Sequence, residues 1–238
     1  HAEPIGRGAV VAPEDTAGRL TGAMAEVLDG EAVVGGFAMW GFSAWSVDDW
    51  RITARVCDDL LGAAAILACL DAVAGQDVAV WGLLTRAEEV GFLGALEAIR
   101  LGTVPAAADV LSLECSKALP DAPQGGGVIV RVGDRMSIFA PALTESLSVA
   151  AERVHASDET FRFQRKLMDG GACEATAFCA SGYRASGLAV PLGNYHNVAD
   201  DGSGIAPETV VIDDWLAEVR LLVELATSPG LLDEATVE

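Results

Sequence analysis

The sequence has few basic residues and almost no lysine. Lysine and arginine together number 15 against 35 acidic residues, which gives a formal net charge of −20 at pH 7. The only lysines among the 238 residues are Lys117 and Lys166. Because binding to nucleic acid or to an anionic membrane surface requires a positive electrostatic footprint, we expect neither partner. A strongly acidic chain instead suits a site that collects cations.

The sequence also lacks paired cysteine motifs, long hydrophobic runs and a secretory pattern at its start. Its five cysteines are odd in number and show no Cys-x-x-Cys spacing, so we expect reduced core residues rather than a disulfide framework. Acidic residues, arginines and glycines interrupt every apolar run before it reaches the length of a membrane span. The first residues show no basic segment followed by an apolar one. We therefore expect a cytoplasmic protein.

From residue 51 onward, apolar runs alternate with segments of helical periodicity. Both alternating faces of residues 78–84 are apolar, as in a buried strand, and apolar residues after position 60 recur at three- and four-residue steps, as in a helix. The expected strands are 52–57, 77–84, 110–113, 126–132, 161–165 and 186–191. The expected helices are 58–74, 95–101, 141–154, 174–182 and 207–226. This alternation predicts an α/β fold in which a mixed, mostly parallel sheet is sandwiched by helices.

Residues 1–50 are less regular. Strands are expected at 8–12 and 32–40, and a helix or a loose turn at 18–28. Glycines punctuate the segment, and three tryptophans lie near one another in its second half. We expect residues 1–50 to be an irregular part of the main domain or a reduced accessory lobe, and residues 51–238 to form the main domain itself.

Ionisable side chains follow the predicted strands. Asp58, Glu88, Glu89, Glu114 and His196 each come directly or shortly after a strand. Open α/β sheets bind ligands outside the carboxyl ends of their strands. Four carboxylates at one edge would repel one another strongly unless a cation neutralised them. Carboxylates with histidine suit zinc, manganese or cobalt better than calcium.

Each of these residues also has a simpler interpretation. Asp58 could be an N-cap of the following helix, which is a common role for aspartate. The pair Glu88 and Glu89 could be a solvated part of a strand–helix loop, and Glu114 could be a solvated strand end. His196 could be a hydrogen-bonded loop histidine. A shared position at one sheet edge favours a common site over these separate roles.

Residues 88–95 read Glu-Glu-Val-Gly-Phe-Leu-Gly-Ala, and residues 58–62 read Asp-Asp-Leu-Leu-Gly. These resemble the Glu-Glu-Val-Gly-x-x-Gly-Ala and Asp-Asp-Arg-x-Gly motifs of the co-catalytic dinuclear zinc aminopeptidases, especially the glutamyl and tetrahedral, or deblocking, aminopeptidase family. Residues 170–175 resemble the family's Gly-Gly-Thr-Asp-Ala stretch, and Pro191 followed by His196 matches its Pro-x-x-x-x-His. Residues 1–3, His-Ala-Glu, are similar to its His-x-Asp. Leu60 and Gly193 stand where the family carries arginines.

The resemblance implies a site and an activity. It implies two divalent metal ions, zinc first and cobalt or manganese as alternatives. The ligands it implies are His1, Asp58, Glu89, Glu114 and His196, with Asp58 bridging the ions. It implies that Glu88 is the general base acting on a metal-bridging water. The substrate would be a peptide cleaved at its N-terminus, residues 51–238 would be a zinc-peptidase-like catalytic domain, and homo-oligomers would be expected.

Two other functions stay open at this point. A carboxypeptidase or deacylase of the same superfold would share the acids but bind a substrate carboxylate. A catalytically inactive homologue would act as a structural or binding subunit. A panel of peptides with free or blocked termini separates the first of these from an aminopeptidase.

Overall fold

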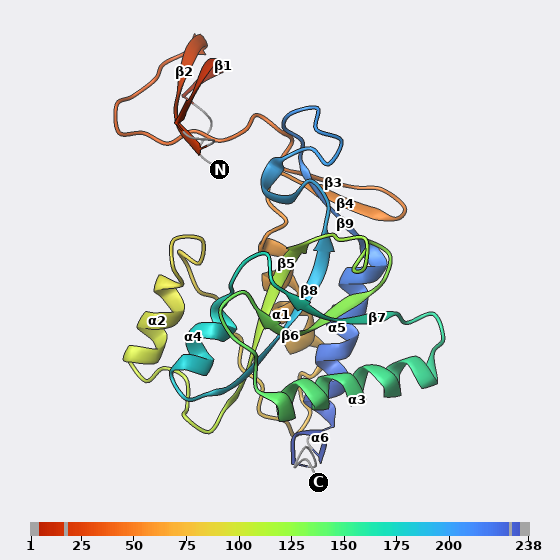
Figure 1. Ribbon diagram of the computed structural model, residues 1–238. Helices are drawn as coiled ribbons and strands as arrows, with labels where there is room; N and C mark the ends of the chain where they lie inside the picture. Colours follow the sequence, from red (N-terminus) through yellow and green to blue (C-terminus); the bar gives the residue numbers. More distant parts are fainter. Residues whose placement is uncertain (1–4, 17–18, 229, 234–238) are drawn as a thin grey trace. The chain divides into compact units, whose positions relative to one another are not determined.

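The computed structural model describes residues 5–16, 19–228 and 230–233, and the chain divides into two compact units between Phe42 and Ser43. The first unit contains an antiparallel pair formed by β1 (Gly6–Thr16) and β2 (Arg19–Gly30) (Figure 1). The strand expected at 8–12 lies within β1. The helix or turn expected at 18–28 is wrong over its described part, because strand pairing overrides the helix propensity of its Ala, Met, Glu and Leu residues. Residues 32–40 form no strand.

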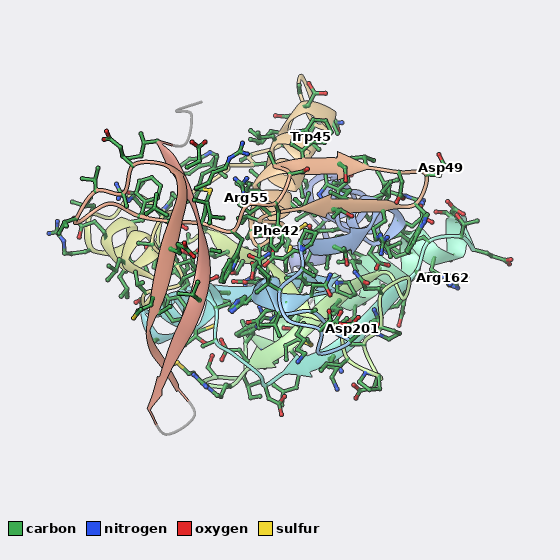
Figure 2. All side chains as sticks on the ribbon, turned by 90° about the horizontal axis from the view of Figure 1, so that it is seen from above. Phe42, Trp45, Asp49, Arg55, Arg162 and Asp201 are labelled. Carbon is green, nitrogen blue, oxygen red and sulfur yellow. The ribbon has the colours of Figure 1, made fainter. Side chains whose placement is uncertain are left out.

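The second unit contains two sheets. The smaller sheet is antiparallel, in the order β3-β4-β9, and consists of β3 (Trp45–Val47), β4 (Arg51–Ala54) and β9 (Glu208–Val211). Asp49 lies in the turn that joins β3 to β4 (Figure 2). The larger sheet has the order β5-β8-β6-β7 and consists of β5 (Asp109–Lys117), β6 (Val128–Asp134), β7 (Phe163–Met168) and β8 (Arg184–Leu192). Its β5–β8 and β6–β7 pairs are parallel and its β6–β8 pair is antiparallel.

Helices cover both faces of the larger sheet (Figure 1). On one face, Val128, Val130 and Leu188 pack against a group of helices, and on the other Ala185 packs with Phe178 and its neighbours. The first face carries α1 (Leu60–Ala72), α3 (Pro141–Ser157) and α5 (Ile212–Thr227), and the second carries α2 (Leu93–Arg100) and α4 (Glu174–Ala180). The short α6 (Gly230–Asp233) follows α5. The predicted mixed α/β sheet between helical layers is therefore confirmed.

Two expected elements of the second unit also differ from the structure. Residues 77–84 form no strand, and Trp81 and Leu84 are 70% and 58% exposed. This run lies against α1, since a Cβ on Gly82 would come within 2.6 Å of the Ile66 side chain, and none of the described strands pairs with it. The helix expected to begin at 207 begins at Ile212, because the β-branched run Thr209-Val210-Val211 forms β9 first.

None of the helices in the described ranges combines the length and the apolar character needed to cross a membrane.

Candidate metal and catalytic site

Asp58 lies in the loop that connects β4 to α1. The next residue, Asp59, is the N-cap of α1 and accepts a 2.9 Å hydrogen bond from the Gly62 amide at Oδ1. The amides of Cys57 and Asp58 both donate to Glu208 Oε2, at 2.6 Å and 3.1 Å. The peptide bond between Asp58 and Asp59 is cis. The loop is held by α1 on one side and by the buried carboxylate of β9 on the other. Asp59 therefore takes the capping role that aspartate commonly has, and Asp58 does not cap α1.

Glu88 and Glu89 lie in the turn that precedes α2. The Glu88 carbonyl accepts hydrogen bonds from the amides of Gly91 and Phe92, and α2 begins at Leu93. Gly91 has a φ of 107°, a conformation that glycine adopts without the steric penalty of a side chain. This compact turn sets the direction in which the two adjacent carboxylates project.

His196 lies in the 3₁₀ turn Tyr195–Asn197, which follows β8. Asn194, His196 and Asn197 all have positive φ values, of 52°, 55° and 61°. Such backbone is uncommon for residues other than glycine and persists where surrounding contacts hold it. Here Asn197 Nδ2 donates to the Arg55 carbonyl at 3.0 Å, which fixes the turn beside the loop that carries Asp58.

The three turns bring Asp58, Glu89 and His196 together. His196 Nε2 lies 3.7 Å from Asp58 Oδ2 and 3.7 Å from Glu89 Oε1, and one ligand atom from each residue lies within 4.8 Å of the others. Ligand atoms about 2.0–2.2 Å from a tetrahedral ion are about 3.4 Å apart, so a small inward movement fits these three around one ion. The donor set of two carboxylates and one imidazole suits zinc, cobalt or manganese.

The charges of the site are unbalanced without a cation. Burial, followed by the neighbouring carboxylates of Asp59, Glu89 and Glu208, raises the pKa of Asp58 to about 8. Burial, Glu89 and Glu174 together raise the pKa of Glu88 to about 7. A bound divalent cation would reverse these shifts, because it favours the ionised form of every carboxylate around it.

Glu114 lies inside β5 rather than at its end, and its side chain is half-buried. Burial raises its pKa well above the ordinary value, while the charge of Arg131 acts in the opposite direction and the charges of Asp58 and Asp59 reinforce the rise. The prediction that the acids share one edge of a single sheet is wrong, since Asp58 follows β4 of the smaller sheet. The loops after two sheets converge instead. Glu114 acts on this group through its charge and makes no three-residue ligand group with it among the described residues.

A second set of potential ligands lies just behind the first. Asp58, Asp59 and Cys115 also offer atoms within 4.8 Å of one another. However, Asp59 Oδ1 already accepts from Gly62 and from Cys115 Sγ, and burial raises the pKa of the Cys115 thiol well above its usual range. We therefore assign this set to structure rather than to metal binding. His1, the remaining residue expected as a ligand, lies outside the described residues.

Sequence reasoning missed Glu208, which orients the Asp58 loop, and two charged residues beside Glu88. Glu208 is 4% exposed within an apolar, β-branched segment, and a glutamate in such a run is the available signal. Glu174, the first residue of α4, accepts a 2.6 Å hydrogen bond from Thr85 and acts on Glu88 through its charge. Arg131, on β6, is the cation that acts on Glu88.

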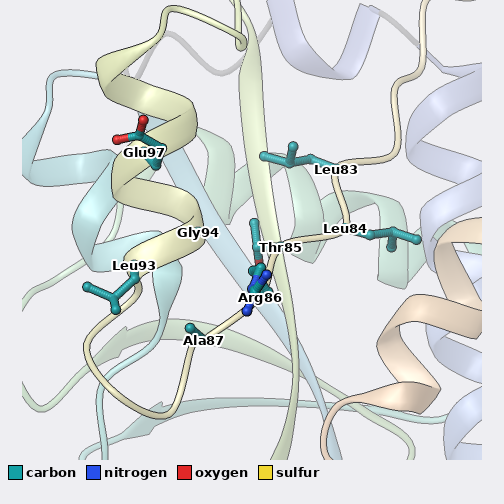
Figure 3. A pocket seen from close by; sticks show the side chains of 8 residues that line it. All are labelled: Leu83, Leu84, Thr85, Arg86, Ala87, Leu93, Gly94 and Glu97. Carbon is teal, nitrogen blue, oxygen red and sulfur yellow. The ribbon is translucent and has the colours of Figure 1, made fainter.

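A shallow pocket of about 400 Å³ lies beside the Glu88 turn, between residues 83–87 and α2 (Figure 3). Leu83, Leu84 and Leu93 supply apolar lining, and Arg86 and Glu97 supply charged lining. Asp58, Glu89 and His196 do not line it. The pocket is therefore not part of the ligand group.

The model of the M42 glutamyl aminopeptidase family matches residues 24–201. The chain belongs to this family. Comparison with curated protein sequences gives no match.

Solved structures of aminopeptidases share the fold. The TET aminopeptidase from the marine sediment archaeon Thaumarchaeota archaeon SCGC AB-539-E09 has a TM-score of 0.67 and 22% identity, over 81% of this chain and 54% of that one. Aminopeptidase APDkam598 from Desulfurococcus kamchatkensis has a TM-score of 0.66 and 21% identity, over 82% of this chain and 54% of that one. The TET1 peptidase of Pyrococcus horikoshii has a TM-score of 0.61 and 22% identity, over 76% and 52%. This M42 chain thus spans about half the length of the solved structures it matches.

Proposed function

We propose that this M42 family chain is the catalytic part of a metal-dependent aminopeptidase that removes the N-terminal residue of a peptide. The residues of this site would hold two divalent ions, zinc first and cobalt or manganese as alternatives. The observation that carries the proposal is the group formed by Asp58, Glu89 and His196 next to Glu88. Family membership gives the reaction class, and the group provides ligands suited to it.

Asp58, Glu89 and His196 would hold one ion. Glu114, with Asp58, would hold the other ion, and His1 is proposed as a further ligand for it. Tyr195 stacks on the His196 ring with centroids 3.8 Å apart and an angle of 20° between planes, which limits rotation of the imidazole. When bound, the ions would supply an activated water and polarise the scissile carbonyl.

Glu88 is suited to move the proton. A general base works best when its pKa lies near the operating pH. Burial with Glu89 and Glu174 raises the pKa of Glu88, and this rise would oppose the lowering that nearby divalent ions would cause. Glu88 would take the proton of the attacking water and pass it to the leaving amine. The carboxylates around the site also favour the positively charged amino terminus of a substrate over a carboxylate. Arg131, whose charge acts on Glu88, is only 3% exposed and is poorly placed to bind the carboxylate that a carboxypeptidase must recognise.

The variant Glu88→Gln tests the proposal, with Glu97→Gln as a matched control. Glu97 lies on α2, where its side chain is 53% exposed and paired with Arg100. We expect Glu88→Gln to retain wild-type metal content and to lose about 10²–10⁴-fold in peptide hydrolysis, the usual contribution of a general base. Glu97→Gln should keep wild-type activity.

The substrates should be peptides of one sequence with free or acetylated amino termini, analysed by mass spectrometry. Stepwise loss of N-terminal residues from the free peptide alone supports an aminopeptidase. Cleavage from the carboxyl terminus, or full activity of metal-loaded Glu88→Gln, contradicts the proposal.

We also propose that the protein assembles as a homo-oligomer in the cytoplasm. The related TET1 peptidase of Pyrococcus horikoshii can assemble into a tetrahedron or a large octahedral shell. The five cysteines are free, and four of them are buried, which fits a reducing compartment. Light scattering at several protein concentrations measures the assembly, and a monomer throughout would contradict it.

A further inference from the structure

Glu174 is a half-buried acid that the proposed mechanism does not use. It is the first residue of α4 and belongs to residues 170–175, a stretch that supplies none of the proposed metal ligands. Its Oε1 accepts a 2.6 Å hydrogen bond from the Thr85 hydroxyl. Thr85 is also half-buried and lies three residues before Glu88, in the stretch that leads into the turn (Figure 3). The bond therefore joins α4 to the segment that carries the proposed base.

The segment that leads into Glu88 depends on side-chain support. None of the described strands pairs with residues 77–84, so no ladder of backbone hydrogen bonds to such a strand holds them in place. Ala87, directly before Glu88, has a φ of 60°, and this backbone conformation is uncommon for residues other than glycine. Such a conformation persists where surrounding contacts hold it. The position of Glu88 therefore depends on the contacts that residues 85–87 make.

Helix α2 supplies the contacts that are local in the sequence. The amides of Leu93 and Gly94 donate to the carbonyls of Ala87 and Arg86, at 3.2 Å and 3.0 Å. A Cβ on Gly94 would lie 2.6 Å from the Arg86 carbonyl oxygen and 3.0 Å from Thr85 Cβ, so the lack of a side chain permits this close approach. The bond from Thr85 to Glu174 adds a contact to a residue 89 positions away in the sequence.

The start of α4 is anchored to the larger sheet. Asp134, the last residue of β6, accepts at Oδ2 from the Cys173 amide at 3.0 Å and from the Thr176 hydroxyl at 2.6 Å. Asp134 is 4% exposed and Cys173 is fully buried. Glu174 therefore projects from a helix start that is tied to β6, and hydrogen bonds lead from β6 through α4 to the segment before Glu88.

We propose that Glu174 is a positioning residue that holds the Glu88 turn in the geometry required for proton transfer. It acts through the Thr85 hydroxyl and does not touch the reacting atoms. A general base must lie within hydrogen-bond reach of the proton that it takes. A misplacement of about 1 Å can lower the rate by about 10²-fold. The inference rests on the proposed function, because it takes Glu88 as the general base.

Steady-state peptide hydrolysis by the zinc-loaded full chain tests the inference. Thr85→Val removes the hydroxyl and keeps the shape of the side chain. We expect Thr85→Val and Glu174→Ala each to lower kcat about 10–100-fold, with KM within about threefold of wild type and zinc content unchanged. Thr85→Ser keeps the hydroxyl donor and Glu174→Gln keeps an acceptor oxygen, so both should stay within about threefold of wild-type kcat. Thr103→Val, at an exposed threonine after α2, is the matched control and should have no effect.

Two further measurements separate a shared role from independent ones. If Thr85 and Glu174 act through one hydrogen bond, the double variant Thr85→Val/Glu174→Ala should lose no more kcat than the slower single variant. Hydrogen–deuterium exchange of the metal-free chain gives a result that needs no activity. Thr85→Val should accelerate exchange of the Gly91 and Phe92 amides, which donate to the Glu88 carbonyl, by about tenfold and leave α5 unchanged.

Four results would overturn the inference. They are losses that multiply in the double variant, a loss expressed in KM alone, a Glu174→Gln variant as slow as Glu174→Ala, and unchanged exchange in Thr85→Val. Wild type that binds zinc but hydrolyses no peptide contradicts the proposed function instead. The exchange of Thr85→Val then still decides whether Glu174 holds the turn.

Discussion

Glu208 is expected to carry a large part of the stability of the Asp58 loop. It is 4% exposed, and its Oε2 accepts from the amides of Cys57 and Asp58 at 2.6 Å and 3.1 Å. Hydrogen bonds to a charged acceptor contribute about 1.5–3 kcal/mol each, and a buried donor left unpaired costs about 1–3 kcal/mol. Two such bonds give about 3–6 kcal/mol for Glu208→Ala. Relief of its repulsion with Asp58 offsets part of this, so we expect a net loss of about 3–4 kcal/mol.

Urea denaturation followed by circular dichroism measures the loss, and zinc titration measures the effect on the site. Glu208→Gln keeps an acceptor oxygen and loses the charge, so it should cost only about 1–2 kcal/mol. Glu152→Ala, at an exposed position of α3, is the control and should stay within about 0.5 kcal/mol of wild type. Zinc affinity should fall in Glu208→Ala, because the Asp58 loop loses its support. A loss below about 1 kcal/mol with unchanged zinc affinity would refute the reasoning.

Two pH-dependent predictions follow from the buried acids. Burial and three neighbouring carboxylates raise the pKa of Asp58 to about 8, so the metal-free fold binds a proton there that the unfolded chain releases, and stability should fall as pH rises from about 4 to 8. Thermal denaturation should show this fall without zinc and a smaller one with excess zinc. Burial alone would raise the pKa of Asp134, but hydrogen bonds from Thr176 and from the Cys173, Met136 and Ser137 amides hold it below its ordinary value. The contribution of Asp134 to the free energy of unfolding is fully present above its pKa in the unfolded chain. It is lost as the pH falls through its lower pKa in the folded protein. Asp134→Asn should therefore lower stability at pH 7 and flatten its acid dependence, and an unchanged acid limb would contradict this.

The sequence predicts the alternation of strands and helices because each element has its own periodicity. The strands now seen as β5, β6, β7 and β8 lie where apolar runs place them, and α3 and α4 follow as expected. Residues 77–84 are different. Their composition is that of a buried strand, but a strand exists only when its backbone groups pair with a neighbour, and composition does not reveal whether a neighbour is present.

The sequence predicts which residues form the candidate site better than it predicts how they are arranged in space. The motifs predict Asp58, Glu89 and His196 as ligands, and the structure brings their side chains together. The position of Glu114 inside β5 could not be predicted, because strand ends depend on pairing. Glu208 and Arg131 carry no motif. Their roles come from burial and from the register of strands far apart in the sequence.

The most direct test of the central claim is the metal content of the protein after dialysis against zinc and removal of free zinc. Elemental analysis of wild type should give at least one tightly bound zinc per chain, because Asp58, Glu89 and His196 form a ligand group for one ion. His196→Ala, which removes the only nitrogen ligand of that group, should lose this zinc while remaining folded. Wild type that retains no zinc, or His196→Ala that retains as much as wild type, would contradict the account.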